Sequence, residues 1–189
     1  MIQNADRFDT HPDIARVVVT REEISQRVTL LAKEIAHDFA GEEITIICAL
    51  TGAILFVSDL MRELENPIRI EPVSVSSYPG KSTRSRECKL RLGVSEKLCG
   101  KNVLLVDDIY DSGQTAAFIE SFVMEHKPAK LRSCMLLRKD RPDIPNRPGR
   151  CDYFGFDIPD EFVVGYGLDF DGLYRNLPFI GVLAEHARN

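Results

Sequence analysis

The fold class follows from one segment, Val103-Leu-Leu-Val-Asp107-Asp108-Ile-Tyr-Asp111-Ser112-Gly113-Gln114-Thr115. Four apolar residues followed by two acids predict a buried strand whose carboxyl end is acidic. The small and hydroxylated residues that come next predict a tight loop leading into a helix over about 116–125. Backbone N–H groups at a helix start are unpaired and carry partial positive charge, so a loop of this kind can bind phosphate.

The side chains of this segment suit a phosphorylated sugar. Gly113 lets the backbone approach a ligand closely, and Ser112 and Thr115 add hydroxyl donors. Asp107 and Asp108 suit ribose hydroxyls or magnesium-bound water. An acidic strand end followed by a helix cap would explain any one of these residues taken singly. Their ordered combination favours a binding site.

The flanking sequence alternates between strands and helices. A capping box at Thr20 and Glu23, followed by apolar residues at helical spacing, predicts a helix that ends near Phe39. A second helix is expected after Gly52. Short apolar runs predict strands at 44–50, 68–76, 103–106 and 131–137. This alternation predicts an α/β fold with a largely parallel, twisted sheet flanked by helices, and ligands in such folds bind beyond the carboxyl ends of the strands.

Three stretches depart from this alternation. Tyr78 to Leu92 is polar and basic without clear periodicity, and we expect an irregular, mobile loop. Asp140 to Gly149 contains three prolines and predicts a surface loop. Residues 151–189 contain short apolar runs and several glycines, which predict a small hood. We therefore expect a single domain over residues 1–189, with a core at about 20–150 and a hood formed mainly by 151–189 together with N-terminal residues.

Composition excludes several classes of function. The net charge of −5, from 24 basic and 29 acidic residues, argues against a nucleic-acid partner. The apolar run at 44–50 is too short to cross a bilayer, and the N-terminus lacks the basic start and apolar run of a secretory signal. Five scattered cysteines without a CxxC pair predict reduced thiols, and hence a cytoplasmic protein without a membrane partner.

Two segments resemble a known family. The run from Val103 to Thr115 resembles the motif that binds phosphoribosyl pyrophosphate (PRPP) in type I phosphoribosyltransferases. The stretch 153–178 resembles the purine-binding end of the hypoxanthine(-guanine) phosphoribosyltransferases, and the wider resemblance extends from Thr20 to Leu183. It implies the type I phosphoribosyltransferase fold and a magnesium-dependent reaction of purine salvage. PRPP and a 6-oxopurine, hypoxanthine or possibly guanine, would give IMP or GMP and pyrophosphate. It also implies a homodimer or homotetramer.

The resemblance assigns four residues to the base. Phe162 takes the place of the aromatic ring on which the purine stacks, and Val163 takes the position whose backbone contacts the base edge. Lys139 matches the lysine that donates to O6; an ammonium has donors only, so it favours an oxo group over the amino group of adenine. Asp111 takes the position of the general base or acid near N7.

The resemblance assigns the remaining polar residues to PRPP and its metal. The PRPP contacts are Asp107, Asp108, Asp111, Ser112, Gly113, Gln114, Thr115, Thr51, Gly52 and Arg175. Asp169 matches a carboxylate ligand of magnesium, with Asp107 and Asp108 as further candidates. Many relatives carry lysine where this chain has Thr51, so a charge is missing there. Ser77 and Tyr78 match the pair at the start of a mobile lid.

Two alternatives stay open at this level. A regulatory relative that senses PRPP would keep the motif of 103–115. Against it, Asp111, Lys139 and Phe162 are all present, and a sensor would not need the full set. The second alternative is the same reaction with xanthine, because the group at purine position two is contacted mainly by backbone carbonyls that the sequence does not display.

Overall fold

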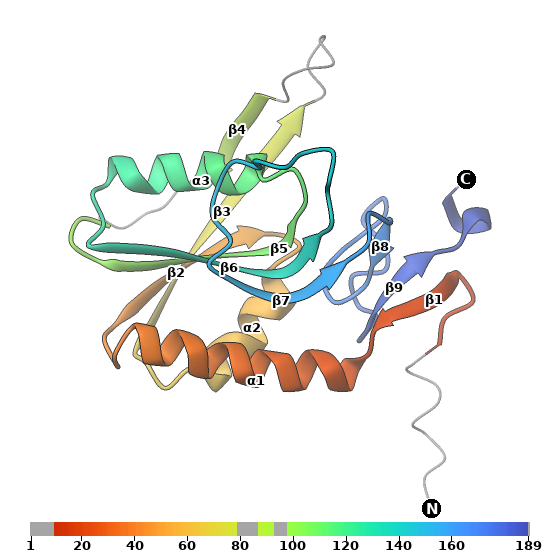
Figure 1. Cartoon of the computed structure of the whole chain (residues 1–189), viewed down its shortest axis with the longest axis horizontal. Helices are drawn as coiled ribbons and strands as arrows, with labels where there is room; N and C mark the ends of the chain where they lie inside the picture. Colours follow the sequence, from red (N-terminus) through yellow and green to blue (C-terminus); the bar gives the residue numbers. More distant parts are fainter. Residues whose placement is uncertain (1–9, 79–86, 93–97, 189) are drawn as a thin grey trace, which may run out of the picture.

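A computed structural model of the protein describes residues 10–78, 87–92 and 98–188. It contains a six-stranded sheet in the order β4-β3-β2-β5-β6-β7 and a three-stranded sheet in the order β1-β9-β8 (Figure 1). The strands are β1 (Ile14–Val19), β2 (Ile44–Leu50), β3 (Ile68–Tyr78), β4 (Glu87–Leu92), β5 (Asn102–Tyr110), β6 (Lys130–Lys139), β7 (Tyr153–Ile158), β8 (Val163–Val164) and β9 (Ile180–Leu183).

The large sheet confirms the predicted α/β class. Strands β3, β2, β5, β6 and β7 are parallel, and only β4 runs antiparallel, at the edge beside β3. Six of the seven residues of β2 are buried, because helices cover both faces of the sheet. Figure 1 shows α1 (Arg21–Asp38) and α2 (Ile54–Glu63) on one face and α3 (Gln114–Glu125) on the other.

Helices α1 and α3 begin directly after the residues that cap them. The Thr20 hydroxyl accepts from the Glu23 amide at 3.2 Å, and the Glu23 carboxylate accepts from the Thr20 amide at 2.8 Å. This confirms the predicted capping box. Helix α3 starts at Gln114, two residues before the position expected, directly after Gly113 in the left-handed conformation. In the described residues, no helix combines the length and the apolar character needed to cross a bilayer.

The sequence predicted an irregular loop from Tyr78 to Leu92, and for Glu87–Leu92 that prediction is wrong. These residues form β4, which pairs antiparallel with the end of β3. The two-residue alternation of Cys88, Leu90 and Leu92 with charged residues was the overlooked signal, and the unpaired edge of β3 supplies the hydrogen-bonding partner. Residues 79–86, where the lid is expected, lie outside the described residues.

The three-stranded sheet, which we call the hood sheet, is built from both ends of the described chain. Strand β1 pairs antiparallel with β9, and β9 pairs antiparallel with β8. A short 3-10 helix, Glu185–Arg188, follows. Figure 1 shows this sheet beside one end of the large sheet, beyond β7. Residues 140–152 connect β6 to β7 without a helix or strand, as predicted for 140–149.

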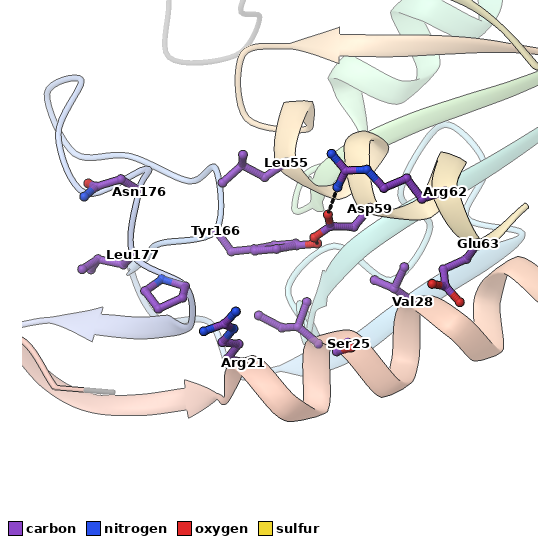
Figure 2. Close-up of a pocket in the computed structure, with 12 residues that line it drawn as sticks. Arg21, Ser25, Val28, Leu55, Asp59, Arg62, Glu63, Tyr166, Asn176 and Leu177 are labelled. Carbon is purple, nitrogen blue, oxygen red and sulfur yellow. Dashed lines mark hydrogen bonds and ion pairs between the residues drawn. The ribbon is translucent and has the colours of Figure 1, made fainter. Parts of the chain in front are cut away.

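Tyr166 ties the segment after β8 to α2. Its backbone has a positive φ of 47°, its side chain is 7% exposed, and its hydroxyl donates to the Asp59 carboxylate at 2.7 Å. Burial raises the pKa of the Tyr166 hydroxyl above its usual value, so the hydroxyl stays a donor. Asp59 also accepts from Arg62 at 2.9 Å, and Figure 2 shows the three side chains together.

Replacing Tyr166 by phenylalanine should lower the free energy of unfolding by about 1.5–3 kcal/mol, the usual range for a hydrogen bond to a charged group. Denaturant unfolding measures this. Arg62→Gln removes an exposed partner of the same carboxylate and should change stability by less than about 0.5 kcal/mol. Equal losses in the two variants would contradict a specific role for the tyrosine hydroxyl.

Candidate active site

Two pockets lie where the parallel strands β2, β5 and β6 end. The first, which we call the acidic pocket, has a volume of about 360 Å³. Its lining consists of Ala49, Leu50, Thr51, Gly52, Val75, Asp107, Asp108, Thr115, Ile119, Asp169 and Arg175. The second, the Phe162 pocket, has a volume of about 220 Å³. It is lined by Asp108, Ile109, Asp111, Lys139, Phe162, Val163, Leu168 and Asp169. The pockets adjoin, because both are lined by Asp108 and Asp169.

The acid pair closes the end of β5. Asp107 is 7% exposed, and one of its carboxylate oxygens accepts from the Asp108 amide at 2.9 Å. Burial, together with the adjacent Asp108 charge, raises the pKa of Asp107 well above its ordinary value. Burial also raises the pKa of Asp108, while the Arg175 charge acts in the opposite direction. Ionising both carboxyl groups is therefore unfavourable in the free site, and a bound cation would relieve that cost.

Glycine brings two further loops against this acid pair. A Cβ atom at Gly52 would overlap the Asp108 carboxylate, and one at Gly167 would overlap the Gly52 carbonyl. Gly167 also has a φ of 105°, a conformation that glycine adopts without strain. The Thr51–Gly52 turn, the end of β5 and the segment after β8 are therefore in direct contact.

Asp169 and Arg175 meet within the acidic pocket. An Arg175 guanidinium nitrogen lies 2.7 Å from one Asp169 oxygen, and the Gly172 amide donates to the other at 2.8 Å. Arg175 also donates to the Gly167 carbonyl at 2.6 Å. This arrangement places one anion and one cation opposite the Thr51–Gly52 turn. A guanidinium can also bind phosphate oxygens, and a carboxylate can also bind a metal ion.

The loop that begins α3 is held from outside the pocket. Gly113 has a φ of 78°, and a Cβ there would overlap the Pro148 carbonyl. The sequence explained Gly113 by close approach to a ligand; the structure adds close approach to the 140–152 loop. The Gln114 amide lies 3.5 Å from the Ser112 hydroxyl, and Thr115 faces the acidic pocket.

The Phe162 pocket contains all four residues assigned to a base. Phe162 is 44% exposed, unusual for a large aromatic side chain, and contacts Phe170 edge-on at 5.7 Å between ring centroids. Lys139 and Asp111 line the same pocket, with the ammonium nitrogen 3.6 Å from an Asp111 oxygen. An open ring face beside a donor and an acceptor can hold a flat heteroaromatic molecule.

Two charged residues here were not identified from the sequence. Asp160 accepts from the Lys139 ammonium at 3.1 Å, and Arg141 contacts the Asp111 carboxylate directly. Arg141 also lies 3.6 Å from Asp160, so the four side chains form a closed ring of alternating charge. Nothing in the sequence indicated this ring, because arginine in a proline-rich surface loop is usually solvated.

Not every predicted residue joins the pockets. Ser77 and Tyr78 form the end of β3, and the lid expected to follow them begins outside the described residues. A pocket of about 580 Å³, the most voluminous of those described, lies between α1, α2 and the segment after β8 (Figure 2). It contains none of the residues predicted for the site.

The donor set fits magnesium that arrives with a substrate. Among the described residues, no three His, Cys, Asp or Glu side chains are close enough together to hold a metal ion. Asp169 and the pair Asp107–Asp108 face one pocket from different segments. Magnesium is commonly held by one or two carboxylates together with substrate oxygens and water, and this pocket offers that set.

Comparison with known proteins agrees with this geometry. Residues 18–171 match the family model of the phosphoribosyl transferase domain. With this match, the fold and the two-part site make the chain a member of the phosphoribosyltransferase family. It is 38% identical over 177 residues to the hypoxanthine-guanine phosphoribosyltransferase of Mycobacterium tuberculosis, covering 90% of this chain and 87% of the relative. The identity to the Streptococcus thermophilus enzyme of the same name is 32%, covering 94% and 97%. Within the family, the chain belongs with the hypoxanthine-guanine phosphoribosyltransferases.

Solved structures give the same relationship. The hypoxanthine-guanine phosphoribosyltransferase of Bacillus anthracis, with HEPES in its active site, is 40% identical and has a TM-score of 0.85, covering 90% of this chain and 99% of that one. The Trypanosoma cruzi hypoxanthine phosphoribosyltransferase, in complex with its product IMP, is 33% identical with a TM-score of 0.84, covering 94% and 98%.

Gly113→Ala should destabilise the protein more than Gly100→Ala. Both glycines have positive φ, 78° and 70°, but only Gly113 is in close contact, since a Cβ at Gly100 would meet nothing within 4 Å. The left-handed conformation costs alanine about 1–2 kcal/mol at either site, and overpacking adds about 1–3 kcal/mol at Gly113. Denaturant unfolding of both variants measures the difference. Equal losses would show that the Pro148 contact is easily relieved.

Asp107→Asn should stabilise the ligand-free protein at neutral pH. The folded-state pKa of Asp107 lies above its ordinary value of 3.8, so its contribution to stability is full below that pH and is lost as the pH rises through the folded-state pKa. Asparagine stays neutral and can keep the bond from the Asp108 amide. Urea unfolding at a series of pH values should show an advantage for the variant that shrinks as the pH falls toward 4. An advantage that grows on acidification would contradict this.

Proposed function

We propose that this protein transfers the phosphoribosyl group of PRPP to hypoxanthine, or to guanine, releasing pyrophosphate and forming IMP or GMP in purine salvage. One observation carries the proposal: two adjoining pockets share Asp108 and Asp169, and their chemistries differ. The acidic pocket offers carboxylates, a guanidinium and the start of α3, which suit a metal-bound pyrophosphate and ribose. The Phe162 pocket offers a ring face and polar groups, which suit a purine.

The base would be held by stacking and selected by one cation. Phe162 supplies a face for any purine, with Val163 at the base edge, whereas the Lys139 ammonium can only donate hydrogen bonds. An oxo group at purine position six would accept from it, and the amino group of adenine would not. Asp160, whose carboxylate accepts from the Lys139 ammonium at 3.1 Å, would hold that ammonium in place, and Asp160 itself does not line the pocket.

The acidic pocket would bind PRPP through groups now paired with one another. Arg175 would turn from Asp169 to a pyrophosphate oxygen, and Asp169 would become a ligand of magnesium. Bound magnesium would neutralise the charge that develops on the departing pyrophosphate. Asp107 and Asp108 would hold the ribose hydroxyls. Thr51 and Gly52 would contact pyrophosphate without the lysine charge common among relatives.

Asp111 would act as the general base that accepts the N7 proton of the purine. The bond from N9 to the anomeric carbon forms as the bond from that carbon to the pyrophosphate oxygen breaks, and the N7 proton passes to the Asp111 carboxylate. Asp108 lines both pockets, so the reacting carbon would lie between them. The loop 111–115 would hold the 5′-phosphate through Ser112, Gly113, Gln114 and Thr115 at the N-terminus of α3.

The proposed function also includes a cofactor, an assembly and a cellular location. Magnesium is the proposed cofactor, and the molecule is proposed to be a homodimer or homotetramer on the basis of its family. A cytoplasmic location is proposed from the reduced cysteines; the four described ones, Cys48, Cys99, Cys134 and Cys151, are free thiols.

A substrate panel tests the activity directly. Hypoxanthine, guanine, xanthine and adenine are each incubated with PRPP and magnesium, and nucleotide formation is scored with and without a chelator. We expect IMP or GMP, little AMP, and no turnover without metal. Full activity after chelation would contradict the metal requirement. The absence of nucleotide with every base would overturn the enzyme and favour a PRPP sensor.

Asp111→Asn should lower turnover about 10²–10⁴-fold, the usual range for general acid–base catalysis. The variant keeps the size of the side chain and can keep the contact with Arg141, but it removes the proton acceptor. Binding of PRPP should change far less, because other groups carry it. Single-turnover kinetics and PRPP titration separate the two effects. Turnover close to wild type would reduce Asp111 to a structural residue, and loss of PRPP binding would place it in the phosphate site.

A further inference from the structure

Arg147 lies in the loop between β6 and β7 and lines neither pocket, yet it contacts the backbone of two residues that do. Its Nη1 atom donates to the carbonyls of Tyr110, Asp111 and Lys139, at 3.1, 3.0 and 2.9 Å. Tyr110 is the last residue of β5 and Asp111 follows it directly, while Lys139 is the last residue of β6. One guanidinium nitrogen thus joins the two strand ends that present the polar groups of the Phe162 pocket.

The pairing between β5 and β6 does not reach these two residues. It ends at Tyr110 and Arg138, one step before Asp111 and Lys139. Lys139 is still held on its other side, where it pairs with Ile158 of β7, whereas Asp111 lies past the end of β5. Arg147 therefore supplies a direct link between the carbonyls of Asp111 and Lys139 where the pairing of their strands has stopped. Because guanidinium hydrogen bonds are charge-assisted, this contact is stronger than a neutral bridge would be.

Arg147 is itself held in place. Its guanidinium carbon lies 4.5 Å from the centroid of the Tyr110 ring, and the Tyr110 hydroxyl contacts the carbonyls of Arg147, Pro148 and Gly149 at 3.3, 3.1 and 3.2 Å. Tyr110 is 7% exposed, and burial raises the pKa of its hydroxyl, so it remains a donor. Arginine and tyrosine therefore brace each other, each bonding to the backbone of the other's segment.

We infer that Arg147 is a positioning residue that sets the spacing between Asp111 and Lys139, and through it the alignment of the base. This inference rests on the proposed function. N7 and O6 lie on the same edge of a 6-oxopurine, so the groups that meet them must keep a fixed separation. Arg141 contacts the Asp111 carboxylate, whereas Arg147 acts on the backbone and leaves both side chains free to meet the base.

The test uses Arg147→Met, which keeps much of the side-chain length but removes the donors, and Arg147→Lys, which keeps a charged donor. Arg150→Met is the matched control, because Arg150 is exposed and lies in the same loop, and it is the Arg150 backbone amide, which the substitution keeps, that donates to the Glu120 carboxylate. For each variant, kcat and KM are measured for hypoxanthine at saturating PRPP and for PRPP at saturating hypoxanthine, together with the melting temperature.

Arg147→Met should lower kcat/KM for hypoxanthine about 10–100-fold, the scale of a displacement of about 1 Å at a reacting group. KM for PRPP should stay within about twofold of wild type. Arg147→Lys should recover part of the loss, and Arg150→Met should match wild type. If Arg147→Met does not fold, Tyr110→Phe removes the brace while keeping the guanidinium, and it should show a smaller loss confined to the base.

Two results would overturn the inference. One is an Arg147→Met enzyme whose kinetics match those of Arg150→Met. The other is an equal rise in KM for both substrates with a lower melting temperature, which would make Arg147 a stabilising residue only. Either result with an active wild-type enzyme leaves the proposed function intact. A wild-type protein inactive with every base would overturn the proposed function, and this inference with it.

Discussion

The close contact at Gly52 is the constraint on which the site depends. The space that a side chain would fill there is taken by the Asp108 carboxylate, and the Gly52 carbonyl lies against Gly167. Three segments distant in sequence are thereby held in contact at the carboxyl ends of parallel strands. Asp169 and Arg175, which follow Gly167, are brought into the same pocket. Without this contact, the acid pair and its counter-charges would belong to separate surfaces.

The two pockets of the site differ in their chemistry. On one side are buried carboxylates whose pKa values are raised because burial disfavours their charge. On the other is the exposed ring of Phe162, with an ion pair between Lys139 and Asp111 beside it. The free protein therefore maintains a site that is electrostatically unfavourable until a cation arrives. Such a site suits a substrate that brings its own metal, and the cost in stability accompanies the function.

The loop between β6 and β7 contacts the backbone of residues that belong to both parts of the site. Arg147 bonds to the backbone of Asp111 and Lys139, while the Pro148 carbonyl occupies the space left by the missing side chain of Gly113. A Cβ at Gly149 would in turn crowd the backbone of α3. A loop without regular structure thus links the ends of β5 and β6 just past the point where their mutual pairing stops.

The sequence by itself determined the parallel sheet, the capped first helix and the strand-to-helix loop at 103–115, because these depend on local periodicity and capping. Through resemblance, it also named the charged residues that line the two pockets, together with Ser112, Gly113 and Gln114, which line neither, and with Ser77 and Tyr78 at the end of β3. It missed β4, whose alternation gained its meaning from the free edge of β3. It also missed Arg141, Arg147 and Asp160. Apart from Lys139, which lies 8 positions from Arg147, their partners here lie 19 to 37 positions away. In a charged surface loop, nothing local distinguishes a solvated arginine from one that contacts two strand ends. Only the tertiary structure decided those contacts, because they depend on where β5, β6 and the hood meet.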